Sequence, residues 1–442
     1  MPRVDVLNLE HTSYSSRDTE SATLVCNYLR MQGLHVVEGC VFQGYELLLR
    51  YRPKLLYITG VEGADINVKV AQFAKYLGCK VVSQCGEGIY VHRTSKAALL
   101  GNLFKKKYPL DKWLLWNETA LQKFKEVVPE VASTLQLAGS PGHDRYKILP
   151  VTTSLTVPQG YTTVVGVGCW TWWPSSFPEQ TQKDFVTSEA RRFESELRHL
   201  IEQSKDTYFL LKEHPGACSH EDSGIASCAN YPNVKVLKQE NIFDCIAASD
   251  IWMTVESTTA TEAWLMGKPT ALLNPSGVDW PLPRQGFHKA QPNFATADTW
   301  IEAIEYYRQT GMLPGFEAYR KKQHKLLCEI AGHIDGLNHV RTGNIILDML
   351  ASPHNTIMES HLKEHVKLAI NNFLHWHLGK YHRWMPKRIP YFKQFEVYQN
   401  TLEKLWHGYE EKNFLRKTRL EQQRTLYENN NLSLEKLRTI YF

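Results

Sequence analysis

Hydroxyl-bearing residues follow a short apolar segment in the second half of the chain. Ser257, Thr258 and Thr259 come directly after residues 251–255, and Gly267 ends the apolar pattern that follows them. The spacing predicts a strand, a hydroxyl-rich turn and a helix. Because the first N–H groups of a helix have no partners within it, such a turn favours a phosphate. An ordinary βαβ unit with a Ser or Thr N-cap fits the same pattern.

Charged and imidazole side chains end an earlier apolar segment. Residues 208–211 lead directly into Lys212, Glu213 and His214, and a Pro-Gly turn follows. In an open parallel sheet, ligands bind beyond the carboxyl ends of the strands. We therefore expect Lys212 and His214 to face the same crevice as the Ser/Thr turn.

The His-Pro pair at 214–215 and the Ser/Thr turn leading to Glu262 resemble the glycosyltransferase-B superfamily. The likeness is to bacterial surface-polysaccharide enzymes that use cytidine nucleotides, namely sialyl-, Kdo- and glycerophosphate transferases. It implies that His214 and the turn residues Ser257, Thr258 and Thr259 hold the donor phosphate, with Lys212 beside them. It also implies that the Glu262 carboxylate holds the donor ribose.

A second element is similar to the same enzymes. Residues 139–144, Gly-Ser-Pro-Gly-His-Asp, resemble the Gly-x-Pro-Arg-x-Asp element that closes the first domain there, with Gly142 in place of the arginine. This substitution puts a phosphate role for that position in doubt.

Strand and helix patterns alternate along the first half of the chain. Strands are expected at 4–9, 34–37, 54–59 and 80–84, with helices at 21–31, 45–51 and 66–77 between them. This order predicts a parallel, doubly wound sheet, and a second series starts at 162. We expect an α/β fold of two Rossmann-like domains facing a cleft: an acceptor domain over 1–150, a linker over 151–160, a nucleotide-sugar domain over 161–335, and a helical extension over 336–442.

Two carboxylates in the first domain are candidates for the reacting group. Glycosyl transfer needs a base, or a nucleophile where the anomeric configuration is retained. Glu87 lies between two glycines after the fourth strand, where the related enzymes often carry an acidic turn. Asp18 follows Arg17 in a pair that again resembles those enzymes, and Arg17 would contact the sugar or acceptor. A helix-start charge at Asp18 and a plain turn carboxylate at Glu87 are the alternatives.

Two further positions in the second domain could contact the sugar or the acceptor. Trp172 belongs to an aromatic run over 170–173 and could stack on a sugar or base, or could instead plug the interdomain cleft. Arg284 could pair with an acidic acceptor or a sugar carboxylate, although a solvated loop arginine fits as well.

Cysteine usage and the N-terminal residues indicate a cytoplasmic protein. Nine cysteines are scattered without a CxxC pair, and the first residues show no signal-peptide pattern. No HExxH or DxD element is present, so we expect no metal cofactor. A leaving CMP carries one phosphate, which a metal-free site can stabilise.

The basic charge of the chain is concentrated near its end. From His361 onward, 15 Lys/Arg stand against 8 Asp/Glu, a net of +7, whereas the whole chain carries +5. The run over 373–388 mixes aromatic and basic residues, a composition typical of anionic membrane surfaces. One alternative is a nucleic-acid-binding arm, but no recognised nucleic-acid-binding module accompanies it. The other alternative is a helical extension that packs on the two domains. If the segment from His361 onward serves to bind a membrane, we expect a chain ending near Ser360 to stay folded.

These patterns favour a peripheral enzyme on the inner face of the cytoplasmic membrane. It would transfer an acidic sugar, such as Kdo or a nonulosonic acid, from a CMP-activated donor to a glycan or lipid-linked acceptor of lipopolysaccharide or capsule. A UDP-sugar or CDP-glycerol-type transferase is the first alternative. A nucleotide-sugar 2-epimerase is the second, and a non-catalytic sugar- or nucleotide-binding scaffold is the third. No nucleic-acid partner is expected.

Overall fold

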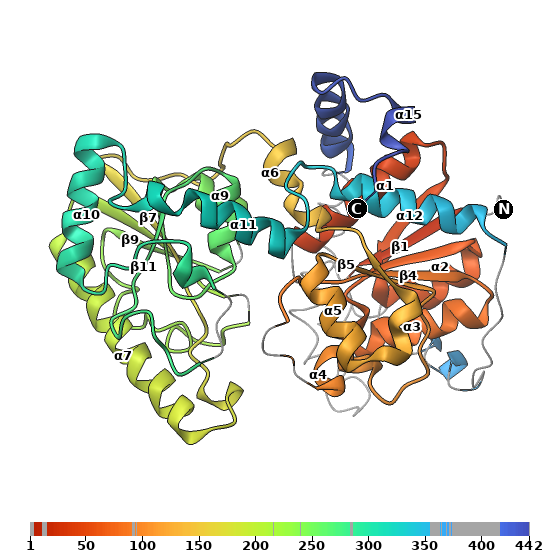
Figure 1. Ribbon diagram of the computed structural model, residues 1–442, viewed down its shortest axis with the longest axis horizontal. Helices are drawn as coiled ribbons and strands as arrows, with labels where there is room; N and C mark the ends of the chain where they lie inside the picture. The colour runs from red at the N-terminus through yellow and green to blue at the C-terminus, as the bar shows by residue number, and fades with distance from the viewer. Residues whose placement is uncertain are drawn as a thin grey trace, which may run out of the picture. The chain divides into compact units, whose positions relative to one another are not determined.

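The computed structural model describes residues 4–10, 16–90, 93, 95–214, 216–238, 240–282, 286–353, 363, 365–367, 369–370, 373 and 416–441, without the side chains of 16–19. The chain divides into two compact units (Figure 1). Unit 1 comprises Met1–Leu149 and Glu329–Phe442, and unit 2 comprises Pro150–Cys328. The chain therefore enters unit 2 after Leu149 and returns to unit 1 at Glu329.

Unit 1 is built on a six-stranded parallel sheet in the order β2-β1-β3-β4-β5-β6. Strands covered on both faces are rich in Val, Leu and Ile, as 55–58 and 80–82 are. The strands are β1 (Val6–Glu10), β2 (Val36–Cys40), β3 (Leu55–Thr59), β4 (Lys80–Gln84), β5 (Lys112–Leu115) and β6 (Leu135–Leu137).

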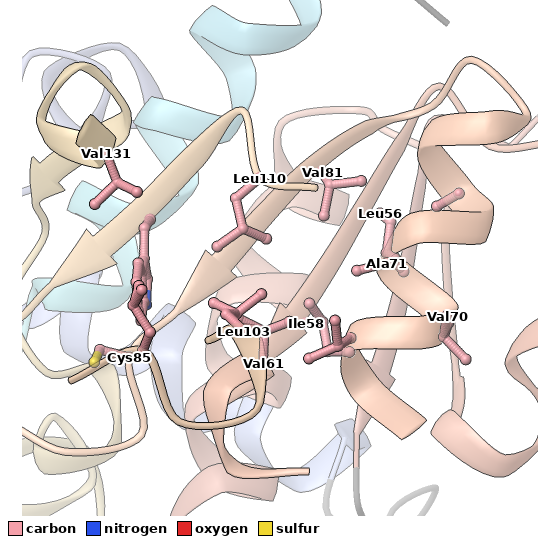
Figure 2. Packing of buried hydrophobic residues seen from close by; sticks show 14 of the residues in the cluster. Leu56, Ile58, Val61, Val70, Ala71, Val81, Cys85, Leu103, Leu110 and Val131 are labelled. Atoms are coloured by element: carbon pink, nitrogen blue, oxygen red, sulfur yellow. The ribbon is translucent and has the colours of Figure 1, made fainter. Parts of the chain in front are cut away.

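Helices cover both faces of this sheet. On one face, α2, α3 and α5 enclose a core in which Leu56 and Val81 of the strands pack near Ala71 of α3 (Figure 2). On the other face, α1 contributes Val25 and α12 contributes Ile346 to a second core. The α-helices of unit 1 before residue 352 are α1 (Ser16–Met31), α2 (Gly44–Tyr51), α3 (Asp65–Tyr76), α4 (Lys96–Leu100), α5 (Glu118–Val127), α6 (Arg145–Ile148) and α12 (Asn338–Ala351).

Unit 2 contains a five-stranded parallel sheet in the order β11-β10-β7-β8-β9. Helices α8 and α9 cover one face with Ile246 and Ala263, and α7 and α10 pack against each other (Figure 1). The strands are β7 (Thr163–Gly168), β8 (Thr207–Lys212), β9 (Val234–Leu237), β10 (Ile251–Thr254) and β11 (Thr270–Leu272); the helices are α7 (Gln180–Gln203), α8 (Ile242–Ala247), α9 (Thr259–Leu265), α10 (Ala297–Thr310) and α11 (Arg320–Ala331).

The two doubly wound α/β units confirm the expected fold class. The structure differs from the expected domain bounds at the C-terminal side, where α12 is part of the unit 1 core instead of a separate extension. The physical reason is that α12 buries Ile345, Ile346 and Met349 against the sheet. All nine cysteines lie in described positions as thiols, and seven of them are buried.

The end of the chain also packs on unit 1. Helix 416–429 and α15 (Leu434–Leu437) bury Tyr427 and Leu437 in a small apolar cluster with Tyr28 and Val340. Figure 1 shows this segment next to α1. Ending the chain near Ser360 would therefore expose this cluster, which contradicts the expectation that such a chain keeps its fold. The aromatic and basic run over 374–388 lies outside the described residues.

Polar contacts reinforce this packing. The Arg419 guanidinium makes a bidentate ion pair with Glu20 of α1, with an Nη2–Oε1 distance of 2.7 Å and the Glu20 side chain 1% exposed. Nδ2 of Asn344 in α12 donates to the carbonyl oxygens of Leu437 and Ile440. Helix 416–429 and α15 are thus structural parts of unit 1.

Candidate functional site

Three strands of unit 2 end level with one another. In the sheet register, Thr254 of β10 pairs with Gly168 of β7, and Gly168 pairs with Lys212 of β8. Neighbouring strands lie about 4.8 Å apart, so the turns after β8 and β10 begin about 10 Å apart, on either side of β7. His214, in the turn after β8, and Ser257, in the turn after β10, thus lie beyond the same edge of the sheet.

The gap between β7 and β10 is the topological switch point of this sheet. Counted along the chain, its five strands have the order 3-2-1-4-5, and the connections from β7 and β10 leave in opposite directions. In open α/β sheets of this kind, the ligand crevice lies at that point. A Cβ at Gly168 would lie 2.4 Å from Oγ1 of Thr259, so the glycine lets the start of α9 approach β7 closely.

A chain of hydrogen bonds orients the hydroxyls at this point. The Trp252 indole Nε1–H donates to Oγ1 of Thr259 at 3.0 Å, and Thr259 in turn donates from Oγ1 to Oγ of Ser257 at 3.0 Å. The Thr259 backbone N–H also donates to Oγ of Ser257 at 3.3 Å. Ser257 accepts both bonds, so neither of them uses its own O–H proton. Hydrogen bonds in such a chain polarise one another.

His214 is held by its own turn. The backbone N–H of Gly216 donates to Nδ1 of His214 at 3.1 Å, so the neutral ring carries its proton on Nε2. The Trp173 ring stands edge-on to the imidazole, with centroids 6.3 Å apart and an interplanar angle of 81°. The Nε2–H of an exposed imidazole is a suitable donor to a phosphate oxygen.

Lys212 is engaged with the backbone. Its Nζ donates to the carbonyl oxygens of Glu213 at 3.1 Å and Lys238 at 2.8 Å, and the residue is buried. Burial lowers the pKa of Lys212 below its usual value. Two ammonium protons thus tie together the turns after β8 and β9, and the phosphate-binding role of Lys212 stays a prediction.

The other expected phosphate and ribose residues lie around the start of α9. Thr258 is exposed at the N-cap of α9, and its carbonyl oxygen accepts a 2.6 Å hydrogen bond from Oγ1 of Thr261. Glu262 is buried in the first turn. Arg284 lies outside the described residues, so its role also stays a prediction.

The tryptophans of the 170–173 run have different environments. Trp172 is 5% exposed and packs against Trp170, Phe193 and Trp280, with the Trp170 centroid 5.0 Å away. Trp172 is therefore buried among side chains of unit 2, and its ring has no accessible face for stacking on a sugar or base. Trp173, which the sequence reasoning did not select, is the tryptophan that contacts His214.

The candidate reacting groups of unit 1 are placed as follows. Glu87 follows β4, its side chain is 58% exposed, and Oε2 lies 3.1 Å from Nη2 of Arg93. Arg17 and Asp18 lie in the first turn of α1, and their side chains are not among those described.

Glu10 is a carboxylate that sequence reasoning did not select. It ends β1, next to β3, at the switch point of the unit 1 sheet. It is 3% exposed; Nδ2 of Asn8 donates to Oε1 at 2.7 Å, and Oγ1 of Thr59 donates to Oε2. The signal for Glu10 in the sequence was an acidic residue at the end of an apolar strand.

Neither a metal-ligand cluster nor a membrane-spanning segment occurs in the described part of the chain. No group of three or more His, Cys, Asp or Glu side chains there could hold a metal ion. No described helix combines the length and apolar character needed to cross a bilayer. The expectation that the protein needs no metal cofactor stays a prediction.

Neither a protein-family model nor a curated protein matches this sequence. Among solved structures, the chain is similar to a UDP-N-acetylglucosamine 2-epimerase with 11% identity and a TM-score of 0.49, over 81% of this chain and 100% of that one. The UDP-GlcNAc 2-epimerase of Neisseria meningitidis bound to UDP-GlcNAc has 10% identity and a TM-score of 0.46, over 78% of this chain and 99% of that one. The wall teichoic acid polymerase TagF has 10% identity and a TM-score of 0.48, over 78% of this chain and 89% of that one. With such low identities, the function must be inferred from the site itself.

Proposed function

We propose that the protein is a metal-independent glycosyltransferase of the glycosyltransferase-B type. It transfers a sugar from a CMP-activated donor to a glycan or lipid-linked acceptor, and unit 2 binds the nucleotide. The observation that carries the proposal is the level ending of β8, β7 and β10, with His214 and Ser257 beyond the same sheet edge at the switch point. Ligand crevices of doubly wound sheets lie at such points.

The chemistry at this edge suits a leaving phosphate. Nε2–H of His214 and the hydroxyl of Ser257 are the proposed donors to its oxygens, and the Trp252–Thr259 contact holds Ser257 in place. Donors positioned before the reaction stabilise charge as it develops on the leaving group. A nucleoside monophosphate needs fewer donors than a diphosphate. Unit 1 would supply the base or nucleophile, with Glu87, Asp18 and Glu10 as its candidates.

Calorimetric titration of the intact chain with CMP, CDP, UDP and a UDP-sugar, in the presence of a chelator, tests the proposal. CMP is expected to bind at least as tightly as CDP and more tightly than UDP. Tight UDP binding without CMP binding would contradict the donor assignment. In that case, NMR of a UDP-sugar without acceptor would separate a 2-epimerase, which produces the epimer, from a UDP-sugar transferase. Failure to bind any nucleotide would exclude the proposed function.

A further inference from the structure

The turn after β8 contains a second histidine, which is paired with a buried carboxylate. Glu213 directly follows β8, and its backbone N–H donates to the carbonyl oxygen of Leu237 at 2.9 Å. The Glu213 side chain is 3% exposed, and its Oε1 lies 2.8 Å from Nδ1 of His220. The His220 side chain is 48% exposed. A buried carboxylate thus holds the imidazole at Nδ1, while nearly half of the histidine side chain remains accessible.

His220 lies in the same corner of unit 2 as the proposed phosphate site. Its carboxylate partner immediately precedes His214 in the chain. The backbone N–H of Trp172, in the loop after β7, donates to the carbonyl oxygen of Asp222 at 2.9 Å, so this loop packs on the turn that carries His220. The neighbouring Trp173 contacts His214. Both histidines thus belong to a turn that flanks the carboxyl end of β7, the strand at the switch point.

The two histidines differ in how their rings can carry a proton. Nδ1 of His214 accepts a hydrogen bond from the Gly216 N–H, and this bond needs a lone pair on that nitrogen. Protonation of Nδ1 would break the bond, so His214 serves as a neutral donor. Nδ1 of His220 instead faces a carboxylate and carries the proton of that contact. Nε2 of His220 can therefore gain a proton without loss of the contact to Glu213.

Lys212 does not direct its charge to the surface of this corner. Two of its three ammonium protons go to the carbonyl oxygens of Glu213 and Lys238, and the residue is buried. His220 is exposed and can present a cation at Nε2. A hydrogen bond from an imidazolium to a phosphate oxygen is charge-assisted and roughly twice as strong as one between neutral groups. The chemistry of His220 therefore suits a phosphate dianion.

The other charged groups near His220 have different surroundings. Asp222, in the same turn, accepts hydrogen bonds from two backbone N–H groups of that turn. Nζ of Lys238, after β9, donates to a backbone carbonyl oxygen of the turn at 2.7 Å. Glu221 is exposed. Glu213 is thus the charged group that the structure pairs with the imidazole.

We infer that His220 is a second phosphate-binding residue of the proposed site and that it binds the phosphate as an imidazolium, with Glu213 as its fixed counter-ion. When the phosphate binds, a proton from solvent adds to Nε2, which donates it in a hydrogen bond to a phosphate oxygen. No covalent bond of the nucleotide forms or breaks in this step. The inference rests on the proposed function, because it needs a nucleotide phosphate at this edge of unit 2.

Calorimetric titration of the full chain with CMP, in Tris and again in HEPES, measures proton uptake because the two buffers differ in ionisation enthalpy. The second pKa of a phosphate is about 6, so at about pH 7.5 CMP is already a dianion and the proton is taken up by the protein. Wild type is expected to take up a measurable fraction of a proton per bound CMP. His220→Asn keeps an N–H for Glu213 but lacks Nε2. It should lose the uptake and raise Kd about 10- to 150-fold.

Two further variants complete the experiment. His199→Asn removes another exposed imidazole of unit 2, which lies 3.7 Å from the exposed carboxylate of Asp298, and should match wild type in affinity and proton uptake. Glu213→Gln keeps an acceptor for Nδ1–H of His220 but removes the counter-ion, so proton uptake should decrease although the histidine is present. Circular dichroism checks each fold, and Glu213→Gln provides the test if His220→Asn does not fold.

Two results would overturn the inference. One is wild-type affinity and proton uptake in a folded His220→Asn protein. The other is weaker CMP binding with unchanged uptake, which would assign the proton to another group. A wild-type chain that does not bind CMP would instead reject the proposed function itself, and this inference with it.

Discussion

Oδ2 of Asp144 accepts a 2.7 Å hydrogen bond from the backbone N–H of His339 and lies 2.8 Å from Nδ1 of the same residue. Both side chains are at most 1% exposed. On the other side of the ring, Nε2 lies 2.5 Å from Oη of Tyr427. Asp144 stands shortly before the chain leaves unit 1, and His339 shortly after it returns. Asp144 and His339 therefore link the segment that leaves unit 1 to the segment that returns to it. Tyr427 in turn ties His339 to helix 416–429.

Asp144→Asn is expected to lower the free energy of unfolding by about 3 kcal/mol. The amide oxygen can keep both bonds from His339 only if the amide N–H₂ group faces Nδ2 of Asn338, a donor that now bonds to Oδ1 of Asp144 at 3.0 Å. Urea denaturation measures this. Asp298→Asn is the control, since Asp298 is 82% exposed and lies 3.7 Å from His199; it should cost less than about 1 kcal/mol. Equal costs for the two variants would mean that the buried contact contributes nothing specific.

His214→Ala is expected to weaken CMP binding while the fold remains intact. A hydrogen bond to a charged group contributes about 1.5–3 kcal/mol, so Kd should rise about 10- to 150-fold. Calorimetry measures the affinity and circular dichroism checks the fold. His199→Ala removes an exposed histidine of the same unit and should leave Kd unchanged. A folded His214→Ala protein with wild-type affinity would exclude this residue from the phosphate site.

Thr259→Val should raise the Kd for CMP about fivefold, since Ser257 loses a hydrogen-bond donor worth about 1 kcal/mol. Thr259→Ser keeps the hydroxyl that links Trp252 to Ser257 and is expected to restore the affinity. If Val and Ser variants bind CMP equally, the hydroxyl chain does not position Ser257.

Glu87→Gln is expected to lower kcat at least 100-fold with CMP affinity nearly unchanged, because glutamine keeps the shape of glutamate but cannot accept a proton. Rapid-quench kinetics with a CMP-sugar donor would measure kcat. Glu10→Gln provides the comparison within unit 1. Wild-type turnover in Glu87→Gln would move the role to Asp18 or Glu10.

The buried carboxyl of Glu62 predicts a pH dependence of stability. Burial, the largest cause, raises the pKa of Glu62 above 4.5, and its Oε2 has no hydrogen-bond partner among the described residues. Between 4.5 and the raised value, the folded state holds a proton that the unfolded state has lost, so raising the pH there favours unfolding. Glu62→Gln should therefore become more stable relative to wild type as the pH rises from 4.5 through the raised pKa of Glu62. Parallel stability curves in urea denaturation would contradict this.

Much of the fold follows from local patterns. The strand expected over 80–84 has the observed bounds of β4, and Gly267 adopts φ +74 just after α9, at the predicted helix end. Alternating apolar strands and helices with glycine stops also led to both parallel sheets. These features depend on neighbouring residues, which the sequence displays directly.

The features that were missed depend on side-chain direction or on distant parts of the chain. Two adjacent tryptophans, Trp172 and Trp173, look alike in sequence, and only packing sends one inward and the other to His214. Lys212 ends its strand as expected, but its side chain reaches the carbonyl oxygen of Lys238 in the turn after β9. Helix periodicity likewise identifies α12 as a helix without showing which sheet it covers.

The passage of the chain out of unit 1 at Leu149 and back at Glu329 has a consequence for biosynthesis. Unit 2 is continuous and can fold as soon as Cys328 has left the ribosome. Unit 1 must wait for residues that are made after unit 2, because Tyr28 bonds to Asn344, 316 positions away, and Glu20 pairs with Arg419. Ribosomes add about 5–20 residues per second, so the N-terminal half remains incomplete for many seconds after its own synthesis. The order of folding is thus reversed relative to the order of translation.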